Sequence, residues 1–150
     1  MAHSYTRLYC HVVFATKNRQ PWIAPDIGQR LYDYMGGIIK GENGDLLAAG
    51  GTDDHVHLLL SLHPQTSVSD ALRLIKTNSS KWIHGTFPDK TKFAWQAGYG
   101  AFSVSRSNLE SVTRYIANQA EHHKRLSFQD EFIDFLKRHE IEFDPRYIWE

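Results

Sequence analysis

Several features that mark special classes of protein are scarce or absent in this sequence of 150 residues. A single cysteine, Cys10, cannot form a disulfide within the chain, which argues against a disulfide-stabilised secreted domain. No apolar run approaches the ~18 residues of a membrane span, and the first residues lack the basic and apolar regions of a signal peptide. We therefore expect a cytoplasmic protein with no membrane partner.

Net charge is also missing, because 17 basic and 17 acidic residues cancel, and this excludes a uniformly basic nucleic-acid-binding protein. The charges are unevenly distributed, however. Residues 66–125 carry nine basic and four acidic groups, whereas residues 126–150 carry three and seven. The middle of the chain can therefore attract a phosphate backbone locally, through a few contacts.

Internal repeats, low-complexity tracts and long linkers are absent as well, and 41% of the residues are hydrophobic, as in globular proteins. The length suits one core. We therefore expect a single domain over residues 1–150, with a core at about 5–105 and further helices at about 107–140.

The secondary-structure signals are alternating apolar residues for strands and Ser or Asp capping boxes for helices. They predict strands at 5–16, 45–51, 55–62 and 93–105, and helices at 26–41, 67–83, 107–123 and 127–139. The order of the first six elements predicts an α+β fold, a ferredoxin-like or RRM-like βαββαβ sandwich with an antiparallel sheet and additional C-terminal helices. Such a sheet has one face covered by helices and one face free for a ligand.

Two histidines, His55 and His57, occupy alternate positions at the start of a predicted strand. Alternate residues of a strand point to the same face, so the two imidazoles can share a metal ion. Nine histidines in the chain make this spacing common by chance, and a half-exposed strand face explains it equally well. Asp54 most simply builds the preceding turn, or else supports the histidines, and His11 on the first strand can face the same site.

A second group lies on the predicted helix 107–123, where Tyr115 and Gln119 are four residues apart and therefore neighbours on one helix face. A nearby cation favours the phenolate of a tyrosine, and a glutamine carbonyl one turn away can bind that cation. The alternative is an amphipathic tyrosine at the margin of a packed helix. His122 and His123 are either extra ligands or solvated residues near the helix end.

Together, these groups resemble the single-tyrosine HUH transposases of small bacterial insertion sequences, a superfamily that includes the REP-associated tyrosine transposases. In that family a His-hydrophobe-His motif precedes a helix with a catalytic tyrosine and a glutamine four residues later. The matching segments here are His11 to Arg19, Asp54 to Leu59, Trp95 to Tyr99 and Tyr115 to Lys124. The resemblance covers nearly the whole chain, and its strength lies in the ordered set of motifs.

The resemblance implies a metal-dependent transposase that cleaves and rejoins single-stranded DNA with hairpin ends. Tyr115 would attack a backbone phosphate, leaving a 5′-phosphotyrosine link and a free 3′-hydroxyl. His55, His57 and Gln119 would hold one divalent ion, magnesium or manganese. It also implies a homodimer with composite active sites, in which the tyrosine helix can complete the partner's histidine site.

Contacts with DNA are expected from basic side chains around the positive middle of the chain and from exposed aromatic rings that stack on unpaired bases. The basic candidates are Lys17, Arg19, Arg73, Lys76, Lys81, Arg106 and Arg114. The aromatic candidates are Trp22, Trp82, Trp95, Tyr99 and Phe102, of which Trp82 is the first to be assigned to the core.

Three alternatives remain at this point. The first is a catalytically silent or domesticated RRM-like nucleic-acid-binding protein, which would have no need of the set His55, His57, Tyr115 and Gln119. The second is a phosphoesterase with two His-x-Thr/Ser motifs, for which only weak candidates exist. The third is a zinc hydrolase that uses His55, His57 and one of His122 or His123.

Overall fold

The computed structural model describes residues 3–150, and Met1 and Ala2 lie outside the described residues. Its strands are β1 (Leu8–Ala15), β2 (Asp45–Gly51), β3 (His55–Leu62) and β4 (Gly100–Val104). Its helices are α1 (Pro25–Gly41), α2 (Val68–Thr86), α3 (Leu109–Ala117), α4 (Gln119–His122) and α5 (Phe128–Arg138), with short 3-10 turns at Lys17–Arg19, Pro88–Lys90 and Arg106–Asn108. The order confirms the predicted βαββαβ unit followed by C-terminal helices.

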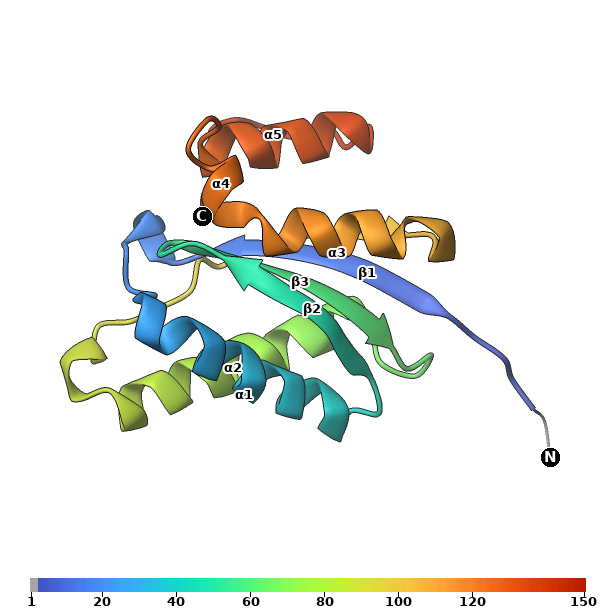
Figure 1. Ribbon diagram of the computed structural model, residues 1–150, viewed down its shortest axis with the longest axis horizontal. Helices are drawn as coiled ribbons and strands as arrows, with labels where there is room; N and C mark the ends of the chain where they lie inside the picture. The colour runs from blue at the N-terminus through green and yellow to red at the C-terminus, as the bar shows by residue number, and fades with distance from the viewer. Residues whose placement is uncertain (1–2) are drawn as a thin grey trace.

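The four strands form one antiparallel sheet in the order β2-β3-β1-β4, as expected for a ferredoxin-like sandwich. In the central pair, Ala15 lies opposite His55 and Val13 lies opposite His57. Helices α1 and α2 cover one face of the sheet, and α3, α4 and α5 lie over the other (Figure 1). The molecule therefore has three layers.

The layer between the sheet and helices α1 and α2 holds the larger apolar core. Alternate residues of β3, namely Val56, Leu58 and Leu60, point into it, and Phe14 of β1 is fully buried there. Cys10 belongs to this core, as predicted, and burial raises the pKa of its thiol to about 11. This face of the sheet is therefore used for apolar packing.

The opposite face of the sheet was expected to be free for a ligand, and that prediction is wrong. The apolar residues Phe128, Phe132 and Leu136 of α5 pack on Val13 and Phe102 of the sheet in a second, smaller core. Helix α3 lies across β2 and β3. Because the expected appended helices fold back over the sheet, its histidine face is buried.

Of the four predicted capping boxes, those at Ser67 and Ser127 form their hydrogen bond and those at Asp26 and Ser107 do not. The side chains of Ser67 and Ser127 accept hydrogen bonds from the backbone N–H of the residue three positions on, as predicted for α2 and α5. The box at Asp26 does not form, because α1 begins at Pro25, whose missing N–H costs nothing in a first turn. The box at Ser107 is replaced by a 3-10 turn that leads into α3.

Two predicted elements are shorter than expected. The strand predicted at 93–105 pairs continuously only over Gly100–Val104, preceded by an isolated bridge between Thr16 and Trp95. The helix predicted at 107–123 breaks at Asn118, which leaves helical geometry and separates α3 from α4. Within residues 3–150, no helix is long and apolar enough to cross a membrane.

Candidate active site

The paired histidines of β3 point away from the apolar core and into the layer beneath α3 and α5. His55 and His57 are both fully buried, with exposed fractions of 0%. Their rings lie edge to face with centroids 5.2 Å apart. The predicted half-exposed strand face is therefore absent, and the two imidazoles share a closed environment.

The outer nitrogen of each imidazole is held by a neighbouring side chain. Asp54 Oδ1 lies 2.8 Å from His55 Nδ1, and Asp54 in turn accepts a hydrogen bond from Thr52 Oγ1 at 3.0 Å. His11 Nε2 lies 2.8 Å from His57 Nδ1. These contacts leave both Nε2 atoms facing the interior of the site, which is the arrangement that outer partners give to metal-binding histidines. Both His11 and Asp54 thus adjoin the site, as the sequence suggested.

Tyr115 and Gln119 reach the histidines from the other side of the layer, across the break at Asn118. Gln119 Oε1 lies 3.1 Å from His55 Nε2, and its side chain is 1% exposed. Tyr115 is half-buried, with its ring centroid 5.8 Å from that of His57. One chain therefore brings all four predicted site residues together.

The close approach of α3 depends on a glycine in β2. A Cβ atom at Gly50 would collide with the backbone carbonyl oxygen of Ile116, the residue after Tyr115. Glycine lets the helix lie directly on the strand, since it has no side chain to hold the two backbones apart. Gly50 thus sets the distance between Tyr115 and the sheet.

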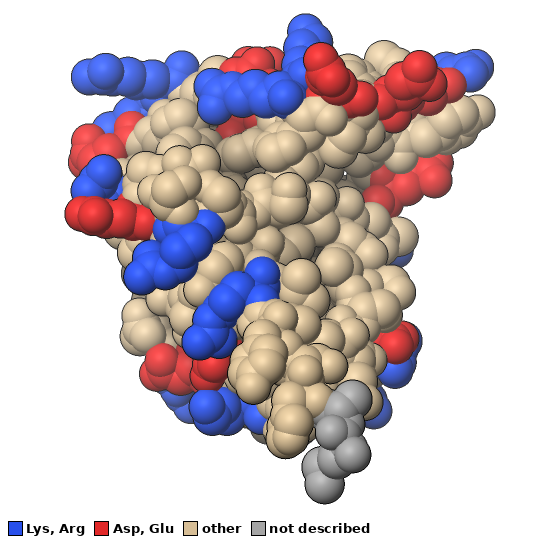
Figure 2. All heavy atoms as spheres, turned by 90° about the vertical axis from the view of Figure 1, so that its right-hand side faces the viewer, with Lys and Arg blue, Asp and Glu red and all other residues tan. Residues whose placement is uncertain are grey.

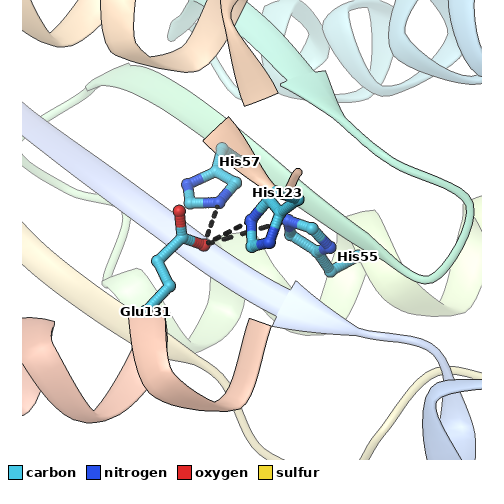
Figure 3. Close-up of side chains that lie close together, drawn as sticks. All are labelled: His55, His57, His123 and Glu131. Carbon is cyan, nitrogen blue, oxygen red and sulfur yellow. Dashed lines mark hydrogen bonds and ion pairs between the residues drawn. The ribbon is translucent and has the colours of Figure 1, made fainter. Parts of the chain in front are cut away.

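A carboxylate that the sequence did not single out lies at the centre of the site. Glu131 of α5 is 1% exposed, and its Oε1 lies 2.9 Å from His57 Nε2, 3.2 Å from His123 Nε2 and 3.8 Å from His55 Nε2 (Figure 3). The donor atoms of these four residues lie within 4.8 Å of one another.

The pKa shifts in the cluster follow from burial and from the mixed charges. Burial lowers the pKa of His57 to about 4, so its imidazole is neutral at pH 7. Burial alone would raise the pKa of Glu131, but hydrogen bonds from His123, His57 and Tyr115 outweigh it and hold the carboxyl ionised. For His123, burial acts to lower the pKa and the contact with Glu131 outweighs it, so the pKa is raised.

The pKa of the Tyr115 hydroxyl is raised well above its usual value, first by burial and then by the neighbouring Glu131. The hydroxyl donates a short hydrogen bond to Glu131 Oε2 and lies 3.1 Å from His122 Nε2. Without a cation the tyrosine is therefore a neutral phenol, and its proton is already shared with a carboxylate.

The donor set of the cluster fits a divalent metal ion. Imidazole nitrogens that point inward, an ionised carboxylate and the Gln119 carbonyl are common metal ligands. Magnesium prefers oxygen and water, so a set rich in imidazole favours manganese or another transition metal over magnesium. His123, one of the two extra ligands considered from the sequence, belongs to this set, whereas His122 contacts the tyrosine.

Solvent reaches the tyrosine through an open groove. The groove has a volume of about 640 Å³ and is lined by Tyr115, Asn118, Glu121, His122, Arg125 and Leu126. A smaller cavity of about 40 Å³ shares Tyr115 and His122 with the groove and is also lined by Glu131. The hydroxyl therefore lies between a surface large enough for a nucleotide backbone and the buried cluster.

The predicted DNA-contact residues do not gather around this groove. Arg73, Lys76 and Lys81 belong to α2, on the other side of the sheet. Lys76 Nζ donates hydrogen bonds to the carbonyl oxygens of Gln96 at 2.9 Å and Gly98 at 2.6 Å, and burial lowers its pKa to about 8. Lys76 is thus engaged in holding the 96–98 loop.

The other basic candidates are mostly at the surface. Lys17 and Arg106 are exposed, Arg19 lies over the ring of Trp149, and Arg114 pairs with Glu110 at 2.9 Å. Basic and acidic side chains are interspersed on the face drawn in Figure 2, without one continuous basic patch. Their contacts with DNA stay predictions.

The aromatic candidates divide by burial. Trp95 and Phe102 are buried in the two cores, with 9% and 3% of their surface exposed, so neither is the exposed ring that was predicted. Trp82 stacks on Tyr34 at the edge of the larger core. Tyr99 is exposed and Trp22 is half-buried.

Glu131 was missed because sequence spacing relates neighbours along a chain, whereas this residue enters the site from a separate helix. A signal was present: Phe128, Phe132 and Leu136 form the apolar stripe of α5, and Glu131 lies on that stripe. A charged residue on a buried helix face needs a partner, which marks it as a site candidate.

Comparison with known proteins gives the family. A family model described as "Transposase IS200 like" matches residues 4–119. The transposase of insertion sequence IS200 from Salmonella typhimurium is 29% identical over 129 residues, covering 83% of this chain and 84% of that protein. The ISDra2 transposase TnpA of Deinococcus radiodurans is 25% identical over 118 residues, covering 75% and 84%.

Solved structures agree on the fold. The crystal structure of a protein described as a transposase from Deinococcus radiodurans R1 superposes with a TM-score of 0.64 at 27% identity, covering 79% of this chain and 96% of that one. A REP-associated tyrosine transposase bound to a REP hairpin gives a TM-score of 0.61 at 15% identity, covering 82% and 73%. The chain therefore belongs to the IS200-like transposases, the single-tyrosine family that its motifs resemble, and membership implies DNA strand transfer.

Proposed function

We propose that this transposase cleaves and rejoins single-stranded DNA through a covalent link to Tyr115, with the help of one divalent metal ion at His55, His57 and Gln119. The observation that carries the proposal is the position of the Tyr115 hydroxyl, between the open groove and the buried imidazoles. Hairpin-forming single strands are the substrate we propose, because a neighbour of the same fold is bound to a REP hairpin.

The chemistry begins with the bound strand lying in the groove, with a phosphate at Tyr115. The tyrosine oxygen attacks phosphorus, the bond from phosphorus to the 3′-oxygen breaks, and the strand leaves with a free 3′-hydroxyl. The phenolic proton passes to Glu131 Oε2, which accepts the hydrogen bond of the hydroxyl, and the departing 3′-oxygen takes up a proton from solvent.

A bound divalent ion would supply Lewis acidity, polarising the scissile phosphate and stabilising the phenolate. His55 and His57 are suited to hold it because their outer nitrogens are already engaged by Asp54 and His11. Manganese is the ion we favour, with magnesium the alternative. Rejoining reverses the attack: a 3′-hydroxyl displaces the tyrosine, so the bond energy is conserved without a nucleotide cofactor.

We also propose that the protein acts as a homodimer. Each subunit contains the two histidines, the tyrosine and the glutamine of one site. A composite site, in which the tyrosine helix completes the partner's histidine site, forms when α3 and α4 exchange between subunits.

The test is a covalent protein–DNA adduct. The protein is mixed with hairpin oligonucleotides carrying single-stranded flanks and with Mn²⁺, and adducts are resolved on a denaturing gel. We expect an adduct with the wild type and none with Tyr115→Phe, because phenylalanine has no nucleophilic oxygen. Tyr147→Phe, which alters an exposed tyrosine, is the matched control and should react normally.

Because end sequences are specific, the oligonucleotides should be taken from the DNA flanking the gene. An equal adduct yield from Tyr115→Phe would reject this tyrosine as the nucleophile. Tight hairpin binding by the wild type without any adduct, with Mn²⁺ present, would instead favour a catalytically silent nucleic-acid-binding protein.

A further inference from the structure

The two carboxylate oxygens of Glu131 face two different sets of partners. Oε1 points to the imidazole nitrogens of His57 and His123, at 2.9 Å and 3.2 Å (Figure 3). Oε2 accepts the hydrogen bond of the Tyr115 hydroxyl and lies 3.2 Å from His122 Nε2. One side chain therefore joins the histidine cluster to the tyrosine.

Burying the ionised carboxylate of Glu131 costs folding free energy unless the charge is compensated. Glu131 is 1% exposed beneath α5, and an ionised carboxylate at such a site is retained only when it is paired with cations or binds a metal. Around Glu131 Oε1 lie the Nε2 atoms of His57, His123 and His55, at 2.9, 3.2 and 3.8 Å. The donor atoms of these four residues lie within 4.8 Å of one another, so one divalent ion could contact the carboxylate and the imidazoles together.

Helix α5 is held in place by contacts in addition to those of Glu131. Ser127 caps its first turn, and Phe128, Phe132 and Leu136 pack against the sheet. The family match ends at residue 119, so Glu131 and His123 come from the segment beyond it. The C-terminal segment therefore brings ligand-type atoms that the motif His55, His57 and Gln119 does not include.

We propose that Glu131 is a ligand of the divalent metal through Oε1 and positions the nucleophile because its Oε2 accepts the hydrogen bond of the Tyr115 hydroxyl. His123 contributes a further imidazole to the same metal. The inference deepens the proposed function and rests on it. Its consequence is that the C-terminal segment completes the active site of its own chain.

The first test measures metal affinity without DNA. Mn²⁺ binding is followed by titration calorimetry on the full chain for the wild type, Glu131→Gln, Glu131→Asp and Asp130→Asn. We expect Glu131→Gln to weaken binding at least about tenfold, and Glu131→Asp, which keeps the charge but is one methylene shorter, to fall between it and the wild type. Asp130→Asn removes an exposed charge from the adjacent position and should stay within about twofold.

A second readout distinguishes a ligand from a packing residue. With Co²⁺ in place of Mn²⁺, loss of a ligand changes the visible absorption spectrum of the bound ion. We expect Glu131→Gln to change that spectrum and Asp130→Asn to leave it as in the wild type. An unchanged spectrum and unchanged affinity in Glu131→Gln would overturn the ligand role, and tighter binding would show that the carboxylate blocks the site instead.

The positioning role is tested at saturating Mn²⁺ in the adduct assay. Glu131→Gln should form the adduct at least about tenfold more slowly than the wild type, while the DNA concentration for half-maximal rate is unchanged. If Glu131→Gln forms the adduct at the wild-type maximal rate once Mn²⁺ is saturating, the positioning role is overturned.

His57→Ala separates failure of this inference from failure of the proposed function. If His57→Ala weakens Mn²⁺ binding and Glu131→Gln does not, only the role of Glu131 is rejected. If neither variant weakens binding, the proposed metal site itself is rejected.

Discussion

On β3 the side chains of Val56, Leu58 and Leu60 enter the layer beneath helices α1 and α2, whereas those of His55 and His57 enter the layer beneath α3 and α5. Both sets are fully buried. The first set lies in a cluster of apolar side chains, while the second lies among imidazoles, a carboxylate, an amide and a phenol.

Within the single strand β3, one face contributes to the stability of the fold and the other provides the side chains of the candidate active site. Apolar packing on the α1 and α2 face stabilises the sheet without directional contacts. On the opposite face, every buried polar side-chain atom among residues 3–150 has a hydrogen-bond partner, which fixes the orientation of each ring. The packed apolar side thus supports a polar side whose geometry is set by a hydrogen-bond network.

The largest expected effect on activity comes from removing a proposed metal ligand, His57, from the polar face of β3. His57→Ala should lower the rate of adduct formation about a thousandfold, since a metal contributes several kcal/mol to the transition state. The rate is measured on denaturing gels with Mn²⁺ and hairpin DNA. A rate within tenfold of the wild type would show that the polar face is a structural network.

The neighbouring position on the apolar face should show the opposite behaviour. Leu58→Ala leaves a cavity in the larger core and should lower the free energy of unfolding by about 2–5 kcal/mol. Urea unfolding measures this loss, and the adduct rate of the protein that stays folded should be close to wild type. A selective loss of the adduct with full stability would contradict the assignment of the two faces.

A smaller effect is expected from removing the side chain that orients a proposed metal ligand. Asp54→Asn removes the carboxylate that holds His55 Nδ1, so Mn²⁺ affinity should fall about 10- to 100-fold. Asp53→Asn, which alters the preceding, exposed side chain of the same turn, is the control. Equal affinities in the two variants would mean that the turn alone orients the imidazole.

The smallest expected effects come from removing the two serine caps. Ser67 caps α2 on one side of the sheet and Ser127 caps α5 on the other. Ser67→Ala and Ser127→Ala each remove one capping hydrogen bond and should cost about 1 kcal/mol of stability. Only Ser127→Ala should also weaken Mn²⁺ binding, by a few fold, because α5 carries Glu131. Thermal unfolding and calorimetry check both, and a similar loss of affinity in Ser67→Ala would show that the effect is not local.

Some of the site was accessible to sequence reasoning because its signals are local. Alternation along β3 predicted that His55 and His57 share a face, and helical spacing predicted that Tyr115 and Gln119 are neighbours. The break at Asn118 did not spoil the second pair, since Gln119 Nε2 still contacts the Tyr115 carbonyl at 3.4 Å. The corrected predictions concern long-range packing: the histidine face of the sheet and the rings of Trp95 and Phe102 are buried.

The sequence by itself determined the order of the strands and helices, the face on which the histidines lie and the family, because periodicity and ordered motifs are properties of neighbouring residues. Only the tertiary structure decided that α5 folds back over the sheet, that Glu131 enters the cluster and that Tyr115 lies at its edge. The physical reason is that these contacts join residues 16 to 74 positions apart, and they form through the packing of two apolar faces, which local spacing does not encode.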